Sequence, residues 1–110
     1  MSMSVDADVA VAPDTTVLKA LAEPVRAQIV ALLAGEELCV CHLVEALAID
    51  QPLVSHHLRV LREAGLVASE RYRYWTYYRL VPEALERTAG QLTALVSSVH
   101  AVDGRRRPCC

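Results

Sequence analysis

The sequence predicts a mainly α-helical domain with a small β-hairpin wing, the winged helix-turn-helix arrangement, and three observations lead to it. Apolar residues recur at helical spacing in segments that Pro and Gly separate. One stretch near residue 70 changes to strand-forming residues and holds all five aromatic side chains of the protein. A long apolar helix follows it. With 110 residues, the chain has room for one domain with its own core.

We expect three regions along the chain. Residues 1–13 lack the basic start and the apolar core of a signal peptide, and Asp6 and Asp8 interrupt them, so they are predicted to form a flexible arm that is disordered or loosely helical. Residues 14–102 form the domain, and residues 103–110 form a flexible tail rich in Arg and Cys. No apolar run approaches the roughly 20 residues that span a bilayer. We therefore expect a cytoplasmic protein without membrane contact, whose thiols stay reduced.

The first three helices are indicated by their caps and breaks. Asp14 is placed to cap the first helix, and Pro24 ends it and opens the second. Gly35 stops the second helix. The third helix has Leu43 and Leu47 on its inner face.

The fourth helix is predicted between Asp50, as its cap, and Gly65. Its buried stripe has the spacing i, i+4, i+7 and consists of Val54, Leu58 and Leu61. Two strands follow, Leu66–Glu70 and Trp75–Val81. The pattern of three helices, a recognition helix and a hairpin makes the third and fourth helices the helix-turn-helix pair.

The last helix opens at Pro82 and has a strong apolar face. Its members are Leu85, Ala89, Leu92, Leu95, Val96 and Val99. A domain of this size needs only part of that face for its own core. We therefore expect a homodimer held by the first and last helices.

Charge is unevenly distributed, although the net charge is only −2. Residues 1–50 carry eight acidic and two basic side chains, whereas residues 59–79 carry five Arg and two Glu. A localised basic face is what phosphate binding requires. Ten of the eleven basic residues are Arg, which recognises phosphates and guanine edges through a planar fork.

Several segments in order resemble the ArsR/SmtB family of metal-responsive repressors. Residues 37–41, Glu-Leu-Cys-Val-Cys, are similar to the metal-binding box of the arsenic and cadmium/lead sensors. Residues 51–67 resemble the family's recognition helix and its exit into the wing. Residues 21–26 and 77–80 match the start of the second helix and the second wing strand. The likeness covers roughly residues 15–100.

The resemblance implies binding to double-stranded operator DNA by a homodimer, with an inverted repeat as the site. Side chains on the recognition helix would reach base edges and phosphates in the major groove, and these are Gln51, Ser55, His56 and Arg59. Arg62, Arg71 and Arg73 would contact the backbone.

The four cysteines form two close pairs, Cys39 with Cys41 and Cys109 with Cys110. Thiolates are soft ligands, so the resemblance implies a repressor released by As(III) or Sb(III), with no permanently bound cofactor. Because arsenite takes three thiolates, one or both tail cysteines would complete its shell, from the same or the partner chain. Cd(II), Pb(II) or Zn(II) sensing and a thiol redox or sulfur switch are the alternatives.

The box itself raises a geometric question. Residues i and i+2 of a straight helix point about 200° apart, so Cys39 and Cys41 would need a frayed or unwound first turn to hold one ion. His42 beside them is a further candidate ligand, although an exposed turn residue is the expected role.

Two departures from the family pattern concern the site. Val44 stands where arsenic sensors of this type often carry a third cysteine, and Arg73 stands where the wing usually turns on glycine. The wing turn therefore cannot depend on a glycine with positive φ; a wider turn, or one shaped by Tyr72 and Tyr74, is expected. An enzyme is not expected, because the chain has no Cys-x-x-Cys pair, no convergent acid and base set and too little length for a substrate cleft.

Overall fold

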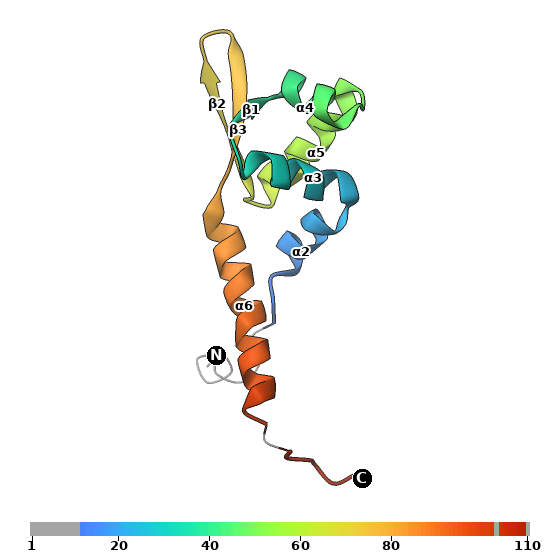
Figure 1. The fold of residues 1–110 in the computed structure, drawn as a ribbon, viewed down its shortest axis with the longest axis vertical. Coiled ribbons are helices and arrows are strands. Elements are labelled where there is room, and N and C mark those ends of the chain that lie inside the picture. Colours follow the sequence, from blue (N-terminus) through green and yellow to red (C-terminus); the bar gives the residue numbers. More distant parts are fainter. Residues whose placement is uncertain (1–11, 103, 110) are drawn as a thin grey trace.

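The computed structural model describes residues 12–102 and 104–109, and its elements follow the predicted order (Figure 1). The helices are α2 (Thr15–Ala22), α3 (Pro24–Leu33), α4 (Val40–Leu47), α5 (Gln51–Glu63) and α6 (Pro82–His100). The strands are β1 (Leu38–Cys39), β2 (Val67–Tyr72) and β3 (Trp75–Leu80). The fold class is thus confirmed as mainly helical with a β-hairpin wing, which consists of β2, β3 and the two residues between them.

The start of α2 has the predicted local cause, whereas Asp50 is the N-cap residue of α5 but makes no side-chain capping hydrogen bond. The Asp14 carboxylate caps α2 by accepting from the backbone N–H groups of Thr16 and Val17. The same carboxylate pairs with Arg87 of α6 at 2.9 Å, and the Asp14 N–H donates to Gln91 Oε1 at 2.8 Å. The start of α2 is therefore tied to the middle of α6.

The core lies between the helices and the base of the wing. Seven side chains are completely enclosed, and they are Val17, Ile29, Leu43, Val54, Leu58, Leu61 and Leu66. The predicted stripe of α5 is confirmed, since all three of its members belong to this set. Gly65, with φ of 79°, ends α5 and turns the chain into the wing. This packing fixes which face of α5 remains exposed.

The sheet has three strands in the order β1-β3-β2, both pairs antiparallel. The hairpin pairing runs from Val67 opposite Leu80 to Tyr72 opposite Trp75. The third strand, β1, consists of only two residues, with Leu38 opposite Tyr78 and Cys39 opposite Tyr77. This short strand was not predicted, and it connects the start of α4 to the wing.

The wing turn corrects a sequence-based expectation. The turn is not wider than usual: only Arg73 and Tyr74 lie between the paired residues Tyr72 and Trp75. Arg73 itself adopts a positive φ of 59°. A two-residue hairpin requires positive φ at its first central position, as in a type II′ turn, and here an arginine supplies it at some cost in strain.

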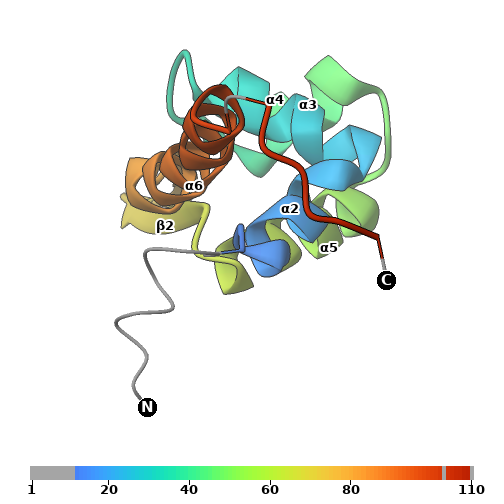
Figure 2. The same ribbon diagram turned by 90° about the horizontal axis from the view of Figure 1, so that it is seen from below.

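Helix α6 begins against the core and then extends away from it (Figure 1). Ala84 and Thr88 are buried, whereas the following turns are open to solvent. Figure 2 shows that α2, α3 and α5 all lie to one side of α6. Exposed apolar side chains continue along its outer half and just beyond, namely Leu92, Leu95, Val96, Val99 and Val102. No helix of the described residues is long and apolar enough to cross a membrane.

Positive φ at Ala48 gives a stability prediction. Ala48 follows α4 with φ of 58° and is exposed, so Ala48→Gly relieves backbone strain without removing a contact. We expect the free energy of unfolding to rise by up to about 1 kcal/mol, since the added entropy of the unfolded chain offsets part of the gain. Denaturant unfolding measures this change in the free energy of unfolding.

The matched control is Ala27→Gly, at an exposed position inside α3. There the free energy of unfolding should fall by about 1 kcal/mol, because the alanine is already helical. Equal destabilisation by both substitutions would show that the positive φ of Ala48 carries no strain.

Candidate functional site

Two thiols converge at the N-terminus of α4. Cys39 is the N-cap residue, with extended backbone (φ −91°, ψ 170°), and Cys41 lies in the first turn. Their Sγ atoms are 2.7 Å apart. Cys39 is buried and Cys41 is exposed, so the pair is reached from one side. We call Cys39 and Cys41 the thiol pair.

The thiol pair corrects the expectation that the first turn must be frayed to bring both sulfurs together. That reasoning placed Cys39 on the helix. In the structure Cys39 belongs to β1, and the helix begins at Val40. The change from extended to helical backbone between the two cysteines directs both sulfurs to the same place, while α4 stays intact.

His42 completes a group of three potential ligands with the thiol pair. Its Nδ1 accepts from the backbone N–H of Cys39 at 3.1 Å and lies 3.3 Å from Cys39 Sγ. The ligand atoms of all three residues lie within 4.8 Å of one another. Because Nδ1 accepts the capping hydrogen bond, the proton of the neutral ring resides on Nε2. His42 is exposed, as expected, and also closes the start of α4.

The two thiols share protons unequally. Burial raises the pKa of the Cys39 thiol, but hydrogen bonds from the Cys41 thiol and from the N–H groups at the start of α4 outweigh it and lower that pKa below its usual value. The hydrogen bond to Cys39, burial and the charge of Cys39 raise the pKa of Cys41. Cys39 is thus the thiol of the pair that ionises first, with Cys41 as its hydrogen-bond donor, and a thiolate is the form that attacks and binds soft ions.

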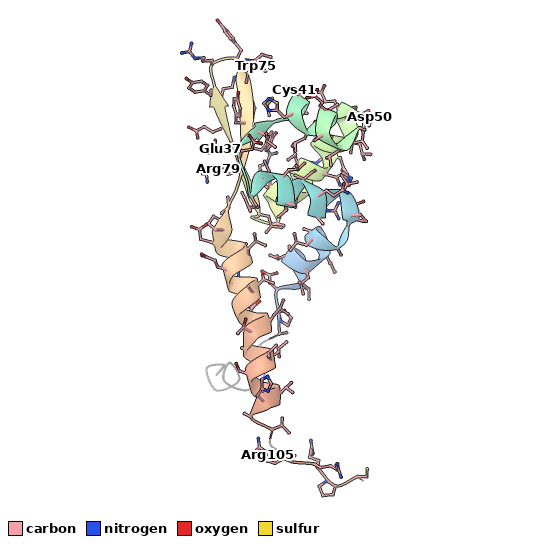
Figure 3. The ribbon with its side chains drawn as sticks, in the orientation of Figure 1. Glu37, Cys41, Asp50, Trp75, Arg79 and Arg105 are labelled. Atoms are coloured by element: carbon pink, nitrogen blue, oxygen red, sulfur yellow. The ribbon has the colours of Figure 1, made fainter. Side chains whose placement is uncertain are left out.

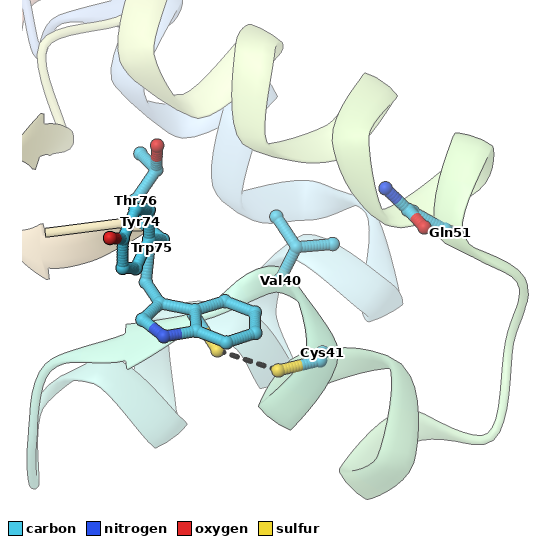
Figure 4. A pocket seen from close by; sticks show the side chains of 7 residues that line it. Val40, Cys41, Gln51, Tyr74, Trp75 and Thr76 are labelled. Atoms are coloured by element: carbon cyan, nitrogen blue, oxygen red, sulfur yellow. Dashed lines mark hydrogen bonds between the residues drawn. The ribbon is translucent and has the colours of Figure 1, made fainter. Parts of the chain in front are cut away.

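A pocket of about 240 Å³ opens beside the thiol pair. Val40 and the wing residues Tyr74, Trp75 and Thr76 line it, together with Gln51 at the start of α5. Figure 4 shows the Trp75 indole close to Cys41 and the contact between the sulfurs. Sequence reasoning did not identify Trp75 as part of the site, because only the β1–β3 pairing brings the wing to these cysteines.

Cys109 is not brought to this group within the part of the chain that the structure describes. Cys109 is exposed in the segment after α6. In Figure 3 Arg105 of the same segment lies at the opposite end of the molecule from Cys41 and Trp75. Cys110 lies outside the described residues. Cys109 would therefore reach a bound ion only from another chain or after rearrangement.

The exposed face of α5 carries every polar residue predicted there. Gln51, Ser55, His56, Arg59 and Arg62 are all open to solvent. The guanidinium of Arg59 lies 3.4 Å from His56 Nδ1. On the wing, Arg71 and Arg73 are also exposed, and the Arg73 guanidinium lies 5.4 Å from the Tyr72 ring centre. The helix and the wing thus offer separate groups of cationic and polar side chains.

A buried histidine fixes α5 against α3. His57 is 6% exposed, and its Nδ1 accepts a hydrogen bond from Arg26 at 3.1 Å. Arg26 also donates to the Ala20 carbonyl, and the Glu23 carboxylate caps α3 and lies 4.0 Å from His57 Nε2. His57 is therefore a helix-packing residue. Its partners were not predicted, since nothing in the local pattern connects residue 26 with residue 57.

The fold and these surfaces define a winged helix-turn-helix domain with a thiol pair at the first helix of the helix-turn-helix. Residues 23–69 match the family described as "Bacterial regulatory protein, arsR family". The chain belongs to this family of transcriptional regulators, which are not enzymes. The resemblance read from the box and the recognition helix is thus confirmed.

Named relatives agree. Over 83 residues the chain is 45% identical to "Arsenic resistance transcriptional regulator ArsR1" of Pseudomonas putida, which covers 74% of this chain and 65% of that protein. It is 38% identical over 72 residues to the "Arsenical resistance operon repressor" of Staphylococcus xylosus. This match covers 66% of this chain and 69% of that protein. The chain spans about half to two thirds of the length of several such relatives.

One solved structure bears on assembly. It is the homodimeric winged helix-turn-helix DNA-binding domain of a possible ArsR-family regulator from Mycobacterium bovis. The TM-score is 0.62 at 27% identity, covering 96% of this chain and 92% of that one.

The His57 environment predicts how stability depends on pH. Burial lowers the pKa of His57; Glu23 opposes this shift, while Arg26 and His56 add to it. The unfolded chain then binds a proton more readily than the folded one below about pH 6.5. The contribution of His57 to the free energy of unfolding is therefore fully present above that pH. It is lost as the pH falls through the lowered pKa.

His57→Gln keeps an acceptor for Arg26 and removes the titration. We expect the free energy of unfolding of this variant to depend less on pH between about 5 and 7 than that of the wild type. His56→Gln, at the exposed neighbouring position, should retain most of the wild-type slope, because burial is the largest cause of the shift and His56 the smallest. An unchanged slope in His57→Gln would contradict the assignment.

Proposed function

We propose that this chain is a DNA-binding transcriptional repressor that leaves its operator when its cysteine thiolates bind As(III) or Sb(III). The observation that carries the proposal is the thiol pair, two sulfurs 2.7 Å apart at the N-terminus of α4. Helix α4 packs directly against α5, the helix with the exposed polar face. Ligand capture and DNA binding therefore involve adjoining helices.

DNA binding is supported by the face of α5. Its buried stripe packs on the core, and this leaves Gln51, Ser55 and Arg59 facing outward. Such side chains read base edges in the major groove, while arginines bind phosphates. In this proposal Gln51, Ser55, His56 and Arg59 make the groove contacts, and Arg62, Arg71 and Arg73 contact the backbone.

A homodimer is supported by the outer half of α6. Leu95 is 43% and Val99 69% exposed, and a solvated helix seldom presents so many apolar side chains on successive turns. Covering this face with a second copy, with α2 beside it, gives a two-fold assembly. Two recognition helices related in this way suit an inverted repeat.

The effector class follows from the donors. Two cysteine sulfurs at one place form a soft ligand set, which suits trivalent arsenic or antimony. The names of the two relatives above also concern arsenic. Arsenite has three exchangeable positions, so the third donor would be Cys109 or Cys110, from this chain or a partner chain, or His42. The same donors leave Cd(II), Pb(II) and Zn(II) as comparison ions for any test.

Coupling to DNA requires that the ligand bind the two shapes of the protein unequally. An ion held by Cys39 and Cys41 acts on the start of α4 and, through β1, on the wing strand β3. Both neighbours of the thiol pair, α5 and the wing, carry proposed DNA contacts. A small displacement of either changes the fit to the operator.

Two substitutions separate the functions. Cys41→Ser, at an exposed position away from the α5 face, should bind an operator fragment as the wild type does but resist release by arsenite. Arg59→Ala should weaken operator binding by about 1–3 kcal/mol while leaving arsenite binding to the thiols unchanged. Fluorescence anisotropy measures operator binding, and a free-thiol assay measures arsenite binding to the cysteines.

The comparison has a clear negative result. If arsenite releases the Cys41→Ser variant as readily as the wild type, the thiol pair is not the sensor. If Cd(II) or Pb(II) releases the wild type and arsenite does not, arsenic is not the effector. Peroxide in a third arm tests a redox signal.

A further inference from the structure

We propose that the thiol pair and the pocket beside it form a site for monosubstituted trivalent arsenicals, R–As(OH)₂, with the organic group R held against Trp75. This inference rests on the proposed function, because it names the ligand class of the same site. It makes Trp75 a specificity-determining residue.

The number of thiols favours such a ligand. Within the described residues only Cys39 and Cys41 lie together; Cys109 belongs to the segment of Arg105, and Arg105 lies at the opposite end of the molecule from Cys41 (Figure 3). The third group near them, His42, already accepts the capping hydrogen bond through Nδ1. Arsenite must find a third donor, whereas an arsenical with one carbon substituent has two exchangeable positions. Two thiols satisfy it completely.

The pocket suits the remaining substituent. Its volume of about 240 Å³ exceeds the roughly 150 Å³ of an apolar cavity that holds benzene. Both cysteines line it, so a group bonded to arsenic there extends directly into it. Val40 and the indole of Trp75 supply apolar surface (Figure 4). Trp75 is 55% exposed in the free protein, and an aromatic or methyl group beside it would cover part of that surface.

The binding step is balanced without a further reactant. The Cys39 thiolate attacks arsenic, one As–O bond breaks, and the departing hydroxide takes the proton of Cys41. The second sulfur then forms its As–S bond as the second hydroxide leaves and takes up from solvent the proton that Cys39 released there when it ionised. Two S–H and two As–O bonds give two As–S bonds and two waters, and arsenic stays trivalent.

The position of the substituent also bears on the response. Gln51, the first residue of α5, lines the same pocket as Trp75 of the wing. A group between them contacts both elements proposed to bind DNA. A larger substituent should therefore release DNA at least as completely as arsenite does.

The test uses the full chain with Cys109→Ser and Cys110→Ser, so that only the thiol pair remains. Arsenite and phenylarsonous acid each compete between this protein and dithiothreitol, with adducts counted by native mass spectrometry. Competition with dithiothreitol corrects for the preference that any dithiol has for the phenyl compound over arsenite. We expect the protein to favour the phenyl compound over arsenite by about tenfold relative to dithiothreitol, as burial of a small aromatic group predicts.

Trp75→Ala should remove most of that preference. Tyr72→Ala is the matched control, because Tyr72 is the cross-strand partner of Trp75 and does not line this pocket. It should retain the preference, and circular dichroism checks that both variants fold. A preference equal to that of dithiothreitol, or one that Trp75→Ala leaves unchanged, overturns the inference.

Release of the wild-type protein from DNA by arsenite is measured in parallel. If arsenite releases DNA but the phenyl preference is absent, the proposed function stands and this inference fails. If neither arsenical binds the thiol pair or releases DNA, both fail.

Discussion

The pairing of Leu38 and Cys39 with β3 is the constraint on which the site depends. It holds Cys39 in extended backbone immediately before α4, so the chain changes direction between the two cysteines. Leu38 is buried and anchors this pairing to the core. Without it, Cys39 would extend the helix and its sulfur would point away from that of Cys41. The same pairing brings Trp75 and the wing to the thiols.

Coupling in this fold therefore needs no long pathway. The thiol pair touches the start of α4, which packs on α5, and β1 touches the strand that carries the wing. Arg26 and His57 hold α5 against α3, so α5 has a firm support on the side opposite its exposed face. In the proposed function, a ligand of the thiols would act at the start of α4, between α5 and the wing. Small displacements of α5 or the wing would be enough for the coupling energies of about 1–3 kcal/mol that are typical of allosteric proteins.

The elements with local signals were predictable from the sequence. Asp14, Pro24, Gly65 and the stripe of α5 set helix ends and faces through caps, backbone freedom and periodicity. The paired cysteines and the polar face of α5 were likewise visible. Strand β1 was not, because two residues paired with a distant strand leave no periodic pattern. Arg73 at positive φ was missed for the opposite reason, since its residue type argues against that conformation.

The central claim is that arsenite binding at the thiol pair and operator binding weaken each other. Reciprocity between these two binding events tests it most directly. If thiol occupancy and operator binding bias the same arrangement of α4, α5 and the wing, arsenite must weaken DNA affinity by the same factor by which DNA weakens arsenite affinity. Arsenite binding to the wild-type chain is therefore titrated with and without saturating operator DNA, at constant salt. The account predicts equal factors, of about fivefold or more. Arsenite affinity that is unchanged by DNA would contradict it.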